Sequence, residues 1–219
     1  MSLWIKICGN TSLEDAQVAF EAGADAVGYV FAASPRRVTI EQVTAIARRL
    51  PEELEQIGVF VDAKLEEIEF AVRACRLTGV QLHSDAGSEL PAMLRARLGP
   101  ELRIVRVVHF GAEAAGRVAA VGVDPNVDAV LVDSRTVAAV GGTGVAFDWK
   151  VAATTLFKSA KEWKLIAAGG LNPANIAEAI ATLRPWGVDV SSGVEAAPGR
   201  KDPEKVREFI AKARAAECG

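Results

Sequence analysis

The chain has 219 residues, 50% of them apolar and 24% charged, which is an ordinary composition for a globular domain. The formal net charge of −3 is small and no run is rich in lysine or arginine, so we expect neither nucleic acid nor a membrane surface as a partner. No stretch is apolar for the length of a membrane-spanning helix, and the N-terminus lacks the pattern of a signal peptide. These features predict a cytoplasmic protein.

The cysteines and histidines do not form a metal-binding pattern. Cys8, Cys75 and Cys218 are odd in number and widely spaced, unlike a disulfide framework. A structural zinc site takes about four closely arranged ligands, which these cysteines do not provide even together with His83 and His109. The sequence therefore predicts no metal site and no cofactor.

Eight short runs are rich in valine and isoleucine and have the length of strands. They comprise residues 3–7, 25–31, 56–61, 79–82, 103–108, 128–132, 164–168 and 187–191. The segments between them carry apolar residues at helical spacing, as at Val43, Ile46, Ala47 and Leu50. Strict alternation of strand and helix implies a parallel sheet. Eight such units in a chain of this length predict an α/β fold, a (β/α)8 TIM barrel, with residues 1–219 as a single domain.

Capping side chains mark several of the predicted helix starts. Thr11 and Thr39 each begin a capping-box pattern, in which this side chain and one three residues later bond to backbone N–H groups. Asn172 and Asp202 each precede a proline that can occupy the first helical position. We therefore expect helices to begin directly after these four residues.

Reactive side chains and glycines gather at the ends of the predicted strands. In a barrel of this type the carboxyl ends of the strands meet at one face, where the active site forms. The residues at or just after these ends are Cys8, Arg36, His83, Asp133, Gly169, Gly170, Ser191, Ser192 and Gly193. This face is therefore the predicted site.

Charged residues of the first and last strands point into the predicted barrel. Lys6 and Cys8 are two residues apart on one strand, so both side chains face the interior. Asp189 faces the interior from the last strand, which lies beside the first once the barrel closes. A buried lysine needs a partner, and Asp189 is the candidate by proximity.

The residues at these strand ends resemble those of the phosphoribosylanthranilate isomerase family. In chain order, the resembling segments are Lys6-Ile7-Cys8-Gly9, Gly28-Tyr29-Val30-Phe31 with Ser34-Pro35-Arg36, Val80-Gln81-Leu82-His83, Val132-Asp133-Ser134 with Gly141-Gly142-Thr143-Gly144, Ala168-Gly169-Gly170-Leu171-Asn172-Pro173, and residues 188–195. They keep their order and spacing from residue 5 to the region of residue 200. Asn10 and Arg37 depart from the family pattern, which has an aliphatic and an aromatic residue at these positions.

The resemblance implies an isomerase of tryptophan biosynthesis that carries out an Amadori rearrangement. The substrate N-(5-phosphoribosyl)anthranilate would become 1-(2-carboxyphenylamino)-1-deoxyribulose 5-phosphate, with one general base, one general acid and no cofactor. Cys8 fits the base and Asp133 the acid. By position alone, a cysteine is more often a small buried hydrophobe, and Asp133 is a solvated or capping carboxylate as often as a catalytic one.

Further residues are expected to bind the substrate. Arg36 would hold the anthranilate carboxylate, with Arg37 as the alternative, and His83 and Asp189 would line the site. The phosphate would lie on two loops that contain Gly169, Gly170, Ser191, Ser192 and Gly193. A flexible loop would close over the substrate and contains Gly141, Gly142, Thr143 and Gly144. Each group also fits a structural role, as a solvated arginine, a structural histidine, a tight turn or a surface loop.

Two other functions remain open from the sequence. One is the related phosphosugar isomerase of histidine biosynthesis, or an enzyme that accepts both substrates. The histidine-pathway isomerase typically has paired aspartates, so Cys8 on the first strand argues against it. The other is a non-catalytic barrel that binds a phosphate ligand, which would need neither Cys8 nor Asp133. The expected partner is a small phosphosugar substrate, and we expect a monomer, with a homodimer as the alternative.

Overall fold

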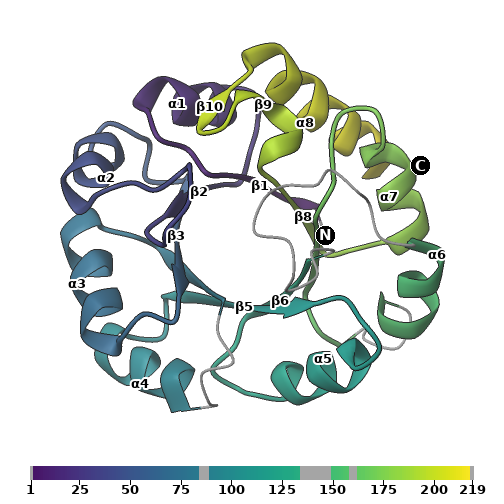
Figure 1. Cartoon of the computed structure of the whole chain (residues 1–219), viewed down its shortest axis with the longest axis horizontal. Coiled ribbons are helices and arrows are strands. Elements are labelled where there is room, and N and C mark those ends of the chain that lie inside the picture. The colour runs from purple at the N-terminus through teal and green to yellow at the C-terminus, as the bar shows by residue number, and fades with distance from the viewer. Residues whose placement is uncertain (1, 84–88, 134–148, 158–161, 218–219) are drawn as a thin grey trace.

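Eight parallel strands form an inner ring and the helices form an outer ring in the computed structural model, which describes residues 2–83, 89–133, 149–157 and 162–217 (Figure 1). The strands are β1 (Trp4–Cys8), β2 (Ala26–Val30), β3 (Glu55–Val61), β4 (Gly79–His83), β5 (Arg103–His109), β6 (Ala129–Asp133), β7 (Leu165–Ala168) and β8 (Gly187–Val190). They pair in chain order, and β8 pairs with β1 to close the barrel. The predicted (β/α)8 TIM barrel is confirmed, and every strand falls within about two residues of its predicted bounds.

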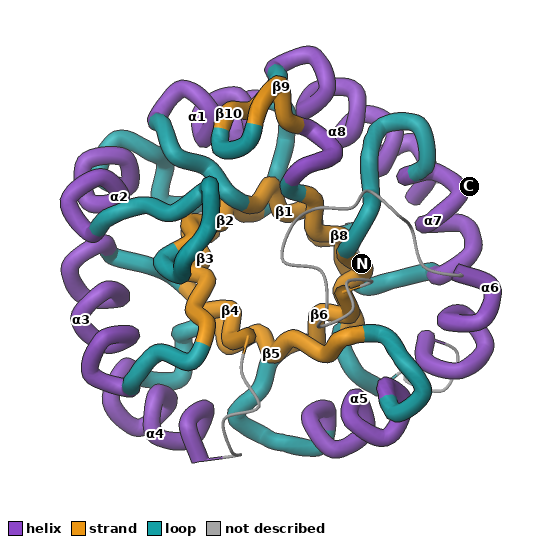
Figure 2. Tube along the Cα trace, viewed as in Figure 1, coloured by secondary structure: helices purple, strands orange, loops and turns teal. Residues whose placement is uncertain are grey.

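Helices follow the strands on the outside of the barrel (Figure 2). They are α1 (Leu13–Glu21), α2 (Ile40–Ala47), α3 (Leu65–Cys75), α4 (Glu89–Leu98), α5 (Ala114–Gly122), α6 (Trp149–Ala152), the π-helix η1 (Ala153–Phe157), α7 (Ile176–Leu183) and α8 (Pro203–Glu217). After β8 come the short 3-10 helix η2 (Ser192–Val194) and a hairpin of β9 (Glu195–Ala197) and β10 (Arg200–Lys201), which the sequence did not predict. Within the described ranges, no helix is long and apolar enough to cross a membrane.

Capping side chains set the start of two helices as predicted. At α2, the Thr39 hydroxyl accepts a hydrogen bond from the Gln42 N–H, and the Gln42 side chain accepts one from the Thr39 N–H. At α8, the Asp202 carboxylate accepts from the N–H groups of Glu204 and Lys205. These bonds satisfy N–H groups that a helix leaves unpaired at its first turn.

Two other predicted helix starts are wrong. Ser12, one residue after the predicted Thr11, is the N-cap of α1, and the Thr11 hydroxyl donates to the carbonyl of Gly199 instead. Asn172 accepts from a backbone N–H two residues on and so stabilises a turn, while α7 begins only at Ile176. In both places the predicted capping side chain forms a different hydrogen bond, a tertiary one at Thr11 and a local one at Asn172, and therefore does not cap the helix.

Apolar side chains fill both sides of the strands. A small cluster inside the barrel comprises Trp4, Ala26, Ile57, Val105, Ala129, Leu131, Ile166 and Ala168. The larger cluster, which includes Ile5 and Ile7 of β1 and Phe209 of α8, lies between the strands and the helices. Along β1, the inward residues change from the apolar Trp4 to Lys6 and then to Cys8. The interior therefore becomes polar toward the carboxyl ends of the strands, the face on which a site is expected.

Candidate active site

Cys8 is the last residue of β1 and is 6% exposed. Gly28 is its partner residue on β2. A Cβ atom built on Gly28 would lie only 2.7 Å from Cys8 Sγ and 3.0 Å from Lys6 Cε. The thiol and the lysine side chain therefore meet over Gly28, inside the barrel, as the alternation of β1 predicts.

Lys6 forms an ion pair within the barrel. Its Nζ donates to Asp189 Oδ1 at 2.7 Å and to Gln81 Oε1 at 2.9 Å. Lys6 and Asp189 are paired residues of β1 and β8, so the partner predicted from barrel closure is confirmed. Burial lowers the pKa of Lys6, but Asp189 and Cys8 raise it by more, and the pKa lies above its ordinary value. The lysine is therefore a charged ammonium in a low-dielectric interior.

The Cys8 thiol is subject to opposing influences. Burial raises its pKa above the ordinary value, and Asp189 raises it further, while Lys6 and Lys201 lower it. Desolvation thus favours the neutral thiol, and the two cations favour the thiolate. The ionisation of Cys8 depends on where these cations are held.

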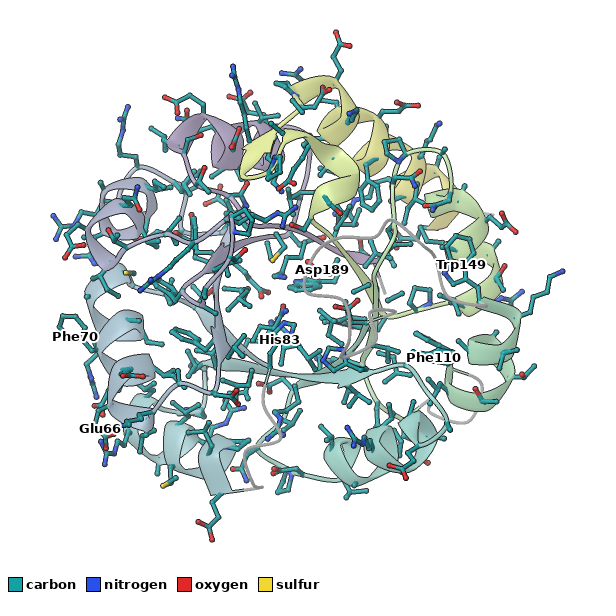
Figure 3. The ribbon with its side chains drawn as sticks, viewed as in Figure 1. Glu66, Phe70, His83, Phe110, Trp149 and Asp189 are labelled. Atoms are coloured by element: carbon teal, nitrogen blue, oxygen red, sulfur yellow. The ribbon has the colours of Figure 1, made fainter. Side chains whose placement is uncertain are left out.

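A hydrogen-bonded series runs from Lys6 toward the mouth of the barrel. Because an ammonium only donates, Gln81 turns its Oε1 to Lys6 and its Nε2 to His83, where the Nε2–Nε2 distance is 2.8 Å. His83 Nε2 must then accept, which makes the ring neutral with its proton on Nδ1. Figure 3 shows His83 and Asp189 inside the ring of strands.

Asp133 ends β6 and is 2% exposed. Its partner residue on β5 is His109, whose ring centre lies 6.3 Å from that of His83. His109 Nδ1 is buried without a hydrogen-bond partner among the described residues. From the sequence, His109 was considered only as a metal ligand. Its position just after a predicted strand could have indicated that it lies at the face where the site forms. Since β7 and β8 separate β6 from β1, Asp133 and Cys8 approach the mouth from different sides.

Arg36 forms a two-pronged ion pair with Glu195, with Nε–Oε1 at 2.7 Å and Nη2–Oε2 at 2.6 Å. Lys201 Nζ donates to Glu195 Oε1 at 3.2 Å and to the carbonyls of Cys8 and Ser191. Burial lowers the pKa of Lys201 and Glu195 opposes this, but three acceptors require all three protons of the ammonium. The hairpin thus joins the ends of β1 and β8. Sequence reasoning missed the roles of Glu195 and Lys201 because it did not predict the hairpin.

Arg37 lies away from this cluster. It is exposed and lines a cavity of about 400 Å³ together with Phe31, Phe60 and Phe70. Phe70 lies on the outer side of α3 (Figure 3). Of the two arginines considered from the sequence, Arg36 is the one that contacts residues at the carboxyl-end face.

The loops after β7 and β8 contain the glycines predicted to bind phosphate. Gly169 and Gly170 have φ angles of 84° and 68°, a conformation that favours glycine, and their N–H groups donate to no other described residue. A Cβ on Gly193, which follows Ser192, would lie 1.8 Å from the carbonyl oxygen of Leu171. The two loops therefore touch, and Gly193 is required for that contact.

Two sets of predicted residues lie outside the described ranges. They are the loop glycines and threonine, Gly141, Gly142, Thr143 and Gly144, and the terminal cysteine, Cys218. The closing loop stays a prediction.

Comparison with known proteins matches nearly the whole chain. The family model described as N-(5'phosphoribosyl)anthranilate (PRA) isomerase matches residues 5–212. The N-(5'-phosphoribosyl)anthranilate isomerase of Geobacter metallireducens is 44% identical over 213 residues, which cover 96% of this chain and 98% of that protein. The enzyme of the same name from Citrifermentans bemidjiense is 43% identical over 211 residues, 96% of each chain.

Solved structures agree with this assignment. Phosphoribosyl anthranilate isomerase from Thermotoga maritima aligns with a TM-score of 0.87 and 35% identity, over 97% of this chain and 99% of that one. A phosphoribosyl anthranilate isomerase in complex with reduced 1-(o-carboxyphenylamino)-1-deoxyribulose 5-phosphate aligns with a TM-score of 0.83 and 34% identity, over the same shares. The match in sequence, extent and fold shows that this chain belongs to the N-(5'-phosphoribosyl)anthranilate isomerase family.

Proposed function

We propose that Cys8 is the general base and Asp133 the general acid in the isomerisation of N-(5'-phosphoribosyl)anthranilate, the reaction of this family in tryptophan biosynthesis. One observation carries the assignment: the last residues of two non-adjacent strands of one barrel are a buried cysteine and a buried aspartate. A proton donor and a proton acceptor can therefore act on different sides of one sugar.

The chemistry requires two proton transfers at different atoms of the ribose. Asp133 donates a proton to the ring oxygen as the C1–O bond breaks, and the electron pair of the anthranilate nitrogen forms a protonated Schiff base at C1. The Cys8 thiolate then removes the proton from C2, and the electrons of that C–H bond form the double bond of an enolamine. Protonation at C1 and loss of the C2 hydroxyl proton give the ketone. Substrate and product are isomers, so no oxidant or reductant is consumed.

Arg36 is the proposed anchor for the anthranilate carboxylate. Its ion pair with Glu195 uses Nε and Nη2 and fixes the plane of the guanidinium group. Nη1 donates to no described residue, so one edge of the group stays available for a carboxylate. His83 and Asp189, which the series from Lys6 connects, would line the sugar.

The phosphate is proposed to bind between the loops after β7 and β8. The N–H groups of Gly169 and Gly170, which donate to no described residue, can approach an anion closely because no side chain intervenes. Ser191, Ser192 and Gly193 contribute from the neighbouring loop. The product analogue in the related solved structure carries a phosphate of the kind this site would bind.

The proposal is tested by following loss of the substrate's anthranilate-linked fluorescence. Cys8→Ser and Asp133→Asn should each lower kcat by about 10²-fold or more with the fold intact by circular dichroism. Cys75→Ser is the matched control, because Cys75 lies on α3, outside the barrel interior, and should keep normal kcat. A near-normal kcat in either site variant would remove that residue from the mechanism. Turnover of the histidine-pathway substrate alone would instead favour the other phosphosugar isomerase.

Two further expectations accompany this proposal. We expect the protein to act in the cytoplasm and to be a monomer. Size-exclusion chromatography with light scattering tests the oligomeric state, and a mass of twice the 23.1 kDa of the chain would replace the monomer with the homodimer.

A further inference from the structure

Lys6 has one more N–H donor than its two hydrogen-bond partners among the described residues use. The residue is 1% exposed, so bulk water does not reach its ammonium group. Asp189 and Gln81 accept two of the three N–H bonds of the ammonium. Cys8 is also close to it, because Cys8 Sγ and Lys6 Cε both lie within 3.0 Å of the position that a Cβ atom would take on Gly28, and the thiol and the ammonium interact by charge. The thiol therefore lies beside the buried cation.

We infer that Lys6 is the counterion of the Cys8 thiolate, held in place by Asp189 and Gln81, and is more than the partner of a buried aspartate. The inference rests on the proposed role of Cys8 as general base. A buried cysteine needs a nearby cation to ionise, because burial alone favours the neutral thiol. Lys6 supplies that cation from the same strand, two residues deeper in the barrel, so it does not occupy the mouth where the sugar would bind.

Several other charged groups act on the thiol and determine what removal of Lys6 would do. Burial and Asp189 raise the pKa of Cys8, and Lys6 and Lys201 lower it. Lys6 lies on the same strand as Cys8, two residues away, and both side chains lie beside Gly28. We therefore expect loss of Lys6 to raise the pKa of the thiol even when Asp189 is neutralised too. Among the described residues, the charged groups around the thiol are Lys6, Asp189, Lys201, Arg36 and Glu195, with Asp15 beside Lys201.

The experiment titrates the Cys8 thiolate by its ultraviolet absorbance. Each protein is compared with the same protein carrying Cys8→Ser, which subtracts the other thiols and the tyrosine. Lys6→Met should move the titration up by about one pH unit or more, a tenfold or greater loss of thiolate at fixed pH. The acid limb of the kcat profile should move up by the same amount, with KM within about twofold, because the substituted group does not contact the substrate's anionic ends.

The double variant Lys6→Met, Asp189→Asn separates the two roles of the lysine. Lys6→Met alone leaves Asp189 buried and unpaired, which can prevent folding. The double variant removes both charges, so it restores a neutral interior. Arg103→Met is the control for loss of a barrel ion pair, because Arg103 pairs with Glu55 at 2.6 Å at the opposite end of the strands. The control should lose stability without moving the Cys8 titration.

The outcomes distinguish this inference from the proposed function. A double variant that keeps the upward shift of the Cys8 titration supports the inference. Wild-type titration of Cys8 in the double variant would overturn the inference, since Lys6 would then act only as the ion-pair partner of Asp189. A shifted titration without any change in the kcat profile would support the counterion but remove Cys8 as the base. Inactivity of Cys8→Ser together with an unshifted titration would keep the base and overturn the counterion.

Discussion

Gly28→Ala tests whether the position of the Cys8 thiol limits catalysis. The added methyl would lie 2.7 Å from Cys8 Sγ and 3.0 Å from Lys6 Cε. Favourable contacts between such atoms need about 3.5–4.0 Å, so one or both side chains must move by roughly 1 Å. A misplacement of about 1 Å near the reacting atoms costs on the order of 10²-fold in rate. Overpacking of this kind also costs about 1–3 kcal/mol of stability. We therefore expect kcat to fall by about 10²-fold in the fluorescence assay, with little change in product affinity.

Gly58→Ala is the matched control for this substitution. A Cβ there would lie 2.7 Å from both Leu77 Cδ1 and Phe60 Cε2, a similar overlap on the apolar side of β3 that faces the helices. Urea unfolding should give a similar loss of about 1–3 kcal/mol, while kcat stays within about threefold of normal. An equal loss of kcat in the two variants would mean that Gly28→Ala disturbs the whole barrel, and the argument from thiol position would be refuted.

Substitutions at the rim and alkylation of the thiols probe the rest of the site. Arg36→Met should raise KM more than it lowers kcat, because it removes a contact remote from the reacting carbons, and Arg37→Met should change neither; steady-state kinetics with the reverse result would exchange the two arginines. Gly170→Asp should abolish competitive inhibition by inorganic sulfate, and retained inhibition would move the phosphate site elsewhere. Iodoacetamide should modify Cys8 before Cys75, as measured by peptide mass spectrometry, and product should protect Cys8; full activity after complete modification of Cys8 would contradict its role as base.

The barrel could be predicted because its signal is repeated and local. Strands of a parallel sheet are buried on both faces and read as continuous apolar runs, and eight of them alternate with helical periodicity. Single caps were less predictable. Thr39 caps α2 as expected, whereas Thr11 bonds to Gly199, 188 residues away in sequence, and leaves the cap to its neighbour. A hydrogen bond to a carbonyl so far away in the chain cannot be predicted from the local sequence.

In the site, too, some contacts could be predicted from the sequence and others could not. The pair of Lys6 and Asp189 followed from strand alternation and barrel closure, two rules that need no side-chain detail. The contacts of Arg36 with Glu195, and of Glu195 with Lys201, did not follow, because β9 and β10 have three and two residues and are too short to show a pattern. A short hairpin that returns to the end of the first strand is visible only in three dimensions.

Charged groups surround the thiol at the carboxyl-end face. The cations are Lys6, Arg36 and Lys201, and the carboxylates are Asp189, Glu195 and, beside Lys201, Asp15. Burial and Asp189 raise the pKa of Cys8, and Lys6 and Lys201 lower it, so the thiolate depends on these two cations. A substrate also brings two anionic groups to the mouth, and these would compete for the same charge if they bound beside the thiol. Holding the carboxylate at Arg36 and the phosphate on the loops after β7 and β8 would keep both away from Lys6, so that the deepest cation stays with the base during the reaction.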